Sequence, residues 1–88
     1  MEKTIENFMN FMQDCVDNEE RIIISVICGN SHFTDSFIPE NNKIKKQEIY
    51  ITGDWAILNI EGDYNISYDE IDKLYIISQG EVKYLIGN

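Results

Sequence analysis

The sequence predicts an α+β fold in which one N-terminal amphipathic helix packs on a curved antiparallel sheet of five to seven short strands. Three observations predict this fold. Apolar residues recur at helical spacing only near the N-terminus, beyond residue 20 they follow the period of two that is typical of strands, and turn residues interrupt that pattern about every 8–12 residues. The chain has 88 residues and a hydrophobic fraction of 43%, which is the size and composition of a single folded domain over 1–88.

The predicted helix covers residues 4–17 and has a single apolar stripe. Counted from Ile5, the apolar residues fall at i, i+3, i+4, i+7, i+10 and i+11: Ile5, Phe8, Met9, Met12, Cys15 and Val16. Thr4 is a suitable N-cap, and Glu6 lies in the first turn, where a negative charge is favourable to the helix dipole. Phe11 lies beside the stripe, so we expect its ring to be half exposed. The stripe must be buried, and we expect it to pack against one face of the sheet.

Seven segments have the residue types and the alternation of strands. The first, Arg21–Cys28, is apolar at both alternations, as in a strand that is covered on both faces. The predicted strands are 21–28, 32–38, 48–52, 55–60, 64–68, 73–78 and 81–86. Gly, Asn and Asp occupy the short connections, and we expect Pro39–Asn42 to form a loop. The short connections predict an antiparallel meander.

A helix followed by several short bent strands resembles the Sm-like and SH3-like small barrels. The resemblance rests on the order and length of the elements, since the Gly and Asn signature that RNA-binding members carry in their loops is missing here. It implies a sheet that closes on itself and so protects its edges, and an RNA-binding or ring-forming module as an alternative function. In that alternative the cluster Lys43, Lys45 and Lys46 would contact phosphate; the other interpretation is a solvated loop beside a protected strand edge.

The cysteines and the N-terminal segment favour a cytoplasmic protein. Cys15 and Cys28 lack C-x-x-C spacing and have apolar neighbours, so we expect two buried free thiols in a reducing compartment. The segment MEKTIENFMNFMQD has no apolar run of seven residues, so we expect no signal peptide. Apolar runs as short as Ile22–Ile24 are far below the ~20 residues that span a bilayer.

No set of residues with catalytic or metal-binding spacing is complete. Asp63–Asp69 has oxygen ligands at the 1, 3, 5 and 7 positions of a calcium loop, but Tyr68 replaces the required Gly and Leu74 replaces the bidentate Glu. His32 is the only histidine. Its neighbour Ser31 would point to the opposite face of a strand, so the two side chains could not share a proton as they would in a Ser-His-Asp triad. We therefore expect no enzyme, no cofactor and no metal.

Acidic residues are the strongest feature of the composition. Sixteen acidic residues against seven basic ones give a net charge of −9, which disfavours unaided binding to DNA, RNA or anionic membranes. The carboxylates gather mostly at predicted turns: Asp14, Asp17, Glu19 and Glu20 at the end of the helix, Asp54 in a later turn, and Glu61, Asp63, Asp69, Glu70 and Asp72 near the C-terminus. Exposed carboxylates would steer the protein onto a basic partner, and the alternative interpretation is that they serve solubility alone.

The short length, the charge of −9 and these two acidic clusters resemble phage-encoded anti-defence inhibitors, anti-CRISPR proteins in particular. The resemblance implies stoichiometric blockade of the nucleic-acid-binding surface of a larger basic protein, such as a nucleic-acid enzyme or a CRISPR effector. The predicted partner-binding region consists of Glu61, Asp63, Tyr64, Tyr68, Asp69, Glu70 and Asp72. A further alternative is a structural or regulatory homodimer formed through apolar strand edges or the helix.

Overall fold

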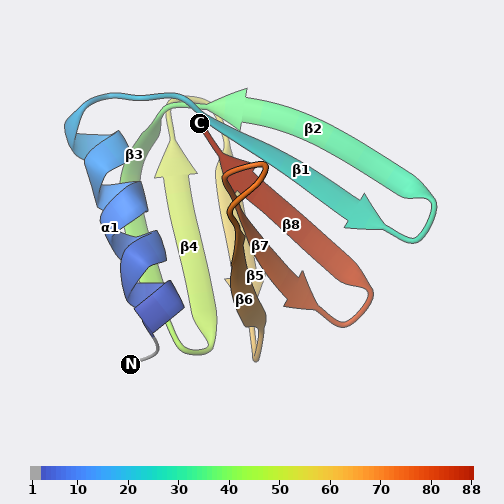
Figure 1. The fold of residues 1–88 in the computed structure, drawn as a ribbon. Helices are drawn as coiled ribbons and strands as arrows, with labels where there is room; N and C mark the ends of the chain where they lie inside the picture. The colour runs from blue at the N-terminus through green and yellow to red at the C-terminus, as the bar shows by residue number, and fades with distance from the viewer. Residues whose placement is uncertain (1–2) are drawn as a thin grey trace.

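The computed structural model describes residues 3–88 as one helix followed by eight strands in two antiparallel sheets (Figure 1). The elements are α1 (Lys3–Asp17), β1 (Ile22–Cys28), β2 (Ser31–Phe37), β3 (Pro39–Lys45), β4 (Glu48–Gly53), β5 (Ile57–Glu61), β6 (Asn65–Asp69), β7 (Leu74–Gln79) and β8 (Val82–Gly87). This order confirms the predicted α+β class. Each of the seven predicted strands has a counterpart whose ends differ by at most two residues.

The predicted arrangement of the strands is wrong in two respects. The strands form a five-stranded sheet in the order β2-β1-β8-β7-β6 and a three-stranded sheet in the order β3-β4-β5, where a single sheet of at most seven strands was expected. Each sheet keeps two edge strands, so the chain does not close into a barrel. The pairing of β1 with β8 joins residues that are distant in sequence, and a local sequence pattern cannot predict such a pairing.

The additional strand is β3, which replaces the loop expected at Pro39–Asn42. The sequence PENNKIK lacks an apolar alternation because β3 is an edge strand on which only Pro39 and Ile44 are buried. Proline at the first position of an edge strand removes no ladder hydrogen bond, and the register shifts between Pro39 and Asn41. Pairing with β4 therefore overrides the weak strand propensity of the segment.

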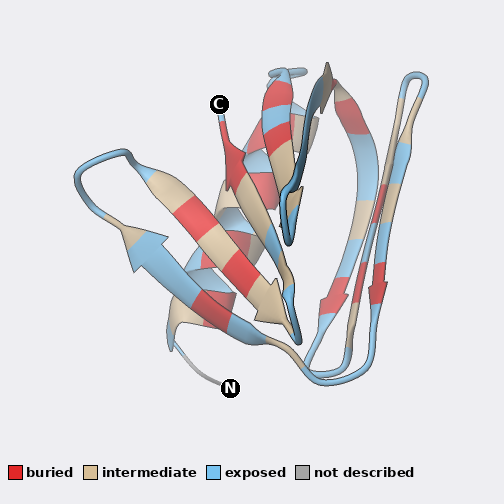
Figure 2. Cartoon of the chain, turned by 90° about the vertical axis from the view of Figure 1, so that its right-hand side faces the viewer, coloured by how far each residue is buried: buried red, intermediate tan, exposed pale blue. Residues whose placement is uncertain are grey.

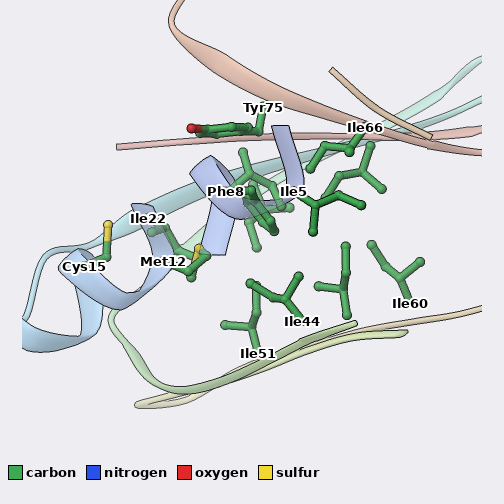
Figure 3. Packing of buried hydrophobic residues seen from close by; sticks show 14 of the residues in the cluster. Ile5, Phe8, Met12, Cys15, Ile22, Ile44, Ile51, Ile60, Ile66 and Tyr75 are labelled. Carbon is green, nitrogen blue, oxygen red and sulfur yellow. The ribbon is translucent and has the colours of Figure 1, made fainter. Parts of the chain in front are cut away.

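The core lies between the inner faces of the two sheets, and buried residues alternate with more exposed ones along most strands (Figure 2). The apolar stripe of α1 is buried, as expected, through Ile5, Phe8, Met12 and Cys15. The helix packs against β3 of the small sheet and β6 of the large sheet, which are edge strands. Its side chains meet Ile44 from one sheet and Ile66 from the other (Figure 3). The helix thus closes one side of the sandwich and does not lie flat on one sheet.

A chain of aromatic rings joins α1 to the large sheet. The ring centroid of Phe8 lies 5.1 Å from that of Tyr75, and Phe11 lies 5.4 Å from Tyr75. Tyr68 continues the chain at 4.8 Å from Tyr75. Phe11 is half-buried, as the sequence predicts. Tilted pairs of this kind stabilise a fold by roughly 0.5–1.5 kcal/mol each beyond the apolar area that they bury.

Candidate functional site

The predicted partner-binding residues lie along one edge of the large sheet but at the two ends of its edge strand β6. Glu61, Asp63 and Tyr64 belong to the β5–β6 turn and its approach, whereas Tyr68, Asp69, Glu70 and Asp72 belong to the end of β6 and the β6–β7 turn. A strand rises about 3.3 Å per residue, so five-residue β6 separates the two acidic turns by roughly 13 Å. The structure therefore brings the carboxylates together as two groups and not as one cluster.

Asp69 and Tyr64 form side-chain hydrogen bonds that hold the two turns in place. Asp69 Oδ1 accepts hydrogen bonds from the backbone N–H groups of Ile71 at 2.9 Å and Asp72 at 3.2 Å, and so closes the β6–β7 turn. The hydroxyl of Tyr64 donates to the carbonyl of Lys45 at 2.6 Å. Asp69 and Tyr64 therefore fix the shape of the two turns.

The β5–β6 turn is held against two other elements. The side-chain amide of Gln79 on β7 donates to the carbonyls of Glu61 and Asp63. The amide of Gln47, in the β3–β4 turn, donates to Asp63 Oδ1 at 2.8 Å, and the carbonyl of Gln47 accepts from Gly62 N–H at 2.8 Å. The turn presents the exposed carboxylates of Glu61 and Asp63 on a fixed backbone.

The basic cluster lies on a strand and its turn, where the sequence placed it in or beside a loop. Lys43 and Lys45 belong to β3, and Lys46 to the β3–β4 turn. Lys43 Nζ lies 3.3 Å from Glu48 Oε1, the single ion pair among residues 3–88. Lys45 is paired across the sheet with Glu48, which is paired in turn with Glu61. Carboxylates are thus interleaved with the lysines, and this arrangement disfavours a phosphate-binding patch.

A second acidic surface gathers at the C-terminal end of α1. Glu19 follows the helix, Glu40 comes from β3 and Asp54 from the β4–β5 turn, and all three line a depression of about 470 Å³. The Asp54 carboxylate accepts from Ile38 N–H at 3.1 Å, which ties its turn to the β2–β3 connection. The last turn of α1 contains no basic residue, so the negative end of the helix dipole adds to this surface. The sequence did not identify Glu40 as part of an acidic surface, because residues 39–42 were expected to form a loop and Glu40 lies on β3.

The two cysteines differ, and the expectation that both are buried is wrong for Cys28. Cys15 is 1% exposed in the core, whereas Cys28 is exposed at the end of β1. Both are free thiols. Burial, together with the smaller effects of the negative charges of Glu20 and Asp14, raises the pKa of Cys15 to about 11. Cys28 is exposed because the β1–β2 hairpin extends beyond the small sheet (Figure 1). The apolar residues next to Cys28 in the sequence gave no indication of this exposure.

We expect a thiol reagent at about pH 8 to label Cys28 rapidly and Cys15 only on unfolding, because the thiolate is the reactive form. Mass spectrometry of the native and the urea-denatured protein measures this, with Cys28→Ser as the control that leaves one slow site. The folded state holds the Cys15 proton more tightly than the unfolded chain, so this stabilisation is present below about pH 9 and lost as the pH rises through about 11. Equal native labelling of both thiols would contradict the placement of Cys15.

His32 lies on β2, and its side chain contacts a neighbour on the same strand. Its ring Nε2 lies 3.4 Å from Thr34 Oγ1, and Asp35 Oδ1 accepts from the backbone N–H of Ser36. Within residues 3–88, no three His, Cys, Asp or Glu side chains are placed to hold a metal ion. No helix in that range has the length and apolar character needed to cross a membrane.

The sandwich has an open side opposite α1, which the sequence did not predict. There an apolar groove of about 260 Å³ lies between the β1–β2 hairpin and β5. We call it the β2–β5 groove, and its principal lining residues are Val26, Phe33, Asp35, Phe37, Ile57 and Leu58. Phe33 is 66% exposed and Ile57 is 63% exposed, whereas Val26 and Leu58 pack against the core. The signal in the sequence was the alternation Phe33-x-Asp35-x-Phe37, which places these side chains on one face.

No protein-family model matches the chain, and neither the curated proteins nor the solved structures contain a match.

Proposed function

We propose that the protein is a non-enzymatic binding protein that occupies a basic, nucleic-acid-binding surface of a larger protein, as anti-CRISPR-like inhibitors do. The observation that carries the proposal is the lack of neutralisation of the carboxylates. The net charge is −9, yet residues 3–88 contain one ion pair, Lys43–Glu48. Carboxylates on fixed turns can replace phosphates against Arg and Lys, which bind both groups through charge-assisted hydrogen bonds.

Within the predicted region, the exposed carboxylates of Glu61, Glu70 and Asp72 are best placed to contact a partner, because Asp69 closes its own turn. Tyr68 lies between the two acidic turns and is 44% exposed. Its ring rests on Tyr75, so little side-chain entropy is lost when a partner covers it. Tyrosine is one of the residue types that are enriched in binding hot spots.

The experiment that tests the proposal is a pull-down from nuclease-treated lysate of the natural host, with the bound proteins identified by mass spectrometry. We expect one larger nucleic-acid-binding protein near equal stoichiometry. Its retention should fall as salt rises, because exposed charges are screened beyond ~8 Å at physiological ionic strength. Recovery of the protein alone would leave the acidic surfaces as a solubility feature and contradict the proposal.

A further inference from the structure

The β2–β5 groove combines apolar walls with the carboxylate of Asp35, and the nearby Arg21 guanidinium contacts Ser36, the residue next to it. Phe33 and Ile57 form an exposed apolar rim, and Asp35 lies between Phe33 and Phe37 on the same face of β2. The Asp35 carboxylate accepts a hydrogen bond from the adjacent Ser36 N–H at 2.9 Å and forms no ion pair within residues 3–88. The volume of about 260 Å³ is below the roughly 300–1,000 Å³ of small-molecule sites, and suits one or two side chains.

The groove runs beside a strand edge that can accept another strand. β2 is an edge strand, and the outward carbonyl of Ser36 accepts from Trp55 Nε1 at 3.0 Å and from Arg21 Nη1 at 3.4 Å. The Ser36 N–H donates to Asp35 Oδ1, so both backbone groups of Ser36 are already bound and an added strand would pair with the rest of β2. In an antiparallel pair every second residue directs its backbone groups to the same side. Thr34 and His32 therefore also present their N–H and C=O groups at the free edge, where strand addition occurs.

Charge decides between the occupants of such a groove. A symmetric contact between two copies would use the same surface twice and bring two Asp35 carboxylates into one apolar interface. Like charges that are removed from water repel, and each molecule already has a net charge of −9. A basic segment, in contrast, would neutralise Asp35. Charge complementarity thus favours a basic partner over a second copy.

We propose that the β2–β5 groove binds an extended segment in which an apolar residue and a Lys or Arg are two positions apart. A strand added to β2 would place side chains of every second residue opposite Phe33 and Asp35. The apolar residue packs between Phe33 and Ile57, and the basic residue pairs with Asp35. The inference rests on the proposed function in one respect, the basic character of the partner. It gives the protein a second surface that contacts this partner.

The probes are three synthetic peptides in one Thr/Ser-rich frame that contain Leu-Thr-Arg, Leu-Thr-Glu or Ser-Thr-Arg. Binding is measured by the fluorescence of Trp55, the only tryptophan, and by amide chemical shifts in NMR. We expect the Leu-Thr-Arg peptide to bind at least about tenfold more tightly than the other two, with shifts confined to β2, Trp55 and β5. Equal affinity for the three peptides, or no binding of any, would overturn the proposal.

Variants locate the contact. We expect Phe33→Ser to weaken binding of the Leu-Thr-Arg peptide by at least about tenfold and Asp35→Asn to remove the preference for Arg over Glu. Ile71→Ser is the matched control, because Ile71 is 91% exposed in the β6–β7 turn, outside the groove, and should leave binding unchanged. The NMR spectrum of each variant shows whether it is folded.

Two further results separate this proposal from its rivals. Sedimentation that reveals a homodimer abolished by Phe33→Ser would overturn it in favour of a second copy. A variant with Lys at Glu61, Glu70 and Asp72 should bind the Leu-Thr-Arg peptide like the unmodified protein if the groove acts by itself. A failed peptide experiment together with a positive pull-down would reject the groove and leave the acidic binding surface standing.

Discussion

Replacement of Phe8 by Ala is expected to reduce the free energy of unfolding by about 3–5 kcal/mol. Phe8 is 0% exposed, and its ring lies between the two sheets in contact with Tyr75 and Phe11 (Figure 3). The truncation loses this packing and leaves a cavity at the point where α1 joins the sheets. Small domains are stable by about 5–15 kcal/mol, so the variant would be close to unfolding.

Urea denaturation followed by circular dichroism measures this loss. Phe33→Ala is the matched control, since it removes the same ring from a site that is 66% exposed, and we expect it to change stability by less than about 1 kcal/mol. Comparable losses in the two variants would contradict the position of α1 as the closure of the core.

Reversal of three charges, with Glu61, Glu70 and Asp72 each replaced by Lys, is expected to slow association with the basic partner recovered in the pull-down by about tenfold or more. The three replacements change the net charge from −9 to −3 and leave Asp63 and Asp69 as the remaining carboxylates of the predicted region. The fold should persist, because the side chains are exposed and exposed charges contribute little to stability. Stopped-flow or surface plasmon resonance measures the rate.

The matched control carries Lys at Asp17, Glu19 and Glu40, which gives the same net charge but alters the acidic surface at the end of α1. If β6 is the contact edge, the control slows association less than the first variant. Equal slowing would mean that the overall charge steers the protein without a defined contact region. Unchanged association in the first variant would reject the predicted region.

The sequence predicts well those elements whose pattern is local. The helical stripe from Ile5 to Val16 has one period and one buried face, so its position and burial follow directly. The strand boundaries are marked by turn residues such as Gly80. The local pattern does not predict β3, because this segment forms a strand only through its pairing with β4. The division into two sheets cannot be predicted in this way, because β1 pairs with β8, which is far from it in the sequence.

The candidate site is predictable in composition but not in roles. Counting carboxylates identifies exposed acidic turns, but Asp69 and Glu70 are alike in sequence although Asp69 alone closes the β6–β7 turn. Likewise, the cluster of Lys43 and its neighbours suggested a phosphate site until the register placed Glu48 beside it. Such roles depend on which backbone group or strand comes near, and tertiary structure alone determines that.

The place of β8 between β1 and β7 has a consequence for how the protein folds during synthesis. The β1–β2 hairpin is complete early in translation, but its inner neighbour β8 is made only after β3 to β7. The large sheet is therefore completed only when pairs such as Ile23–Gly87 form. These residues are far apart in sequence, and contacts between distant residues make folding slow. Until then the edge of β1 that β8 later covers, with its isoleucines, is open to aggregation, so fast translation from β3 to β8 would improve the yield of folded protein.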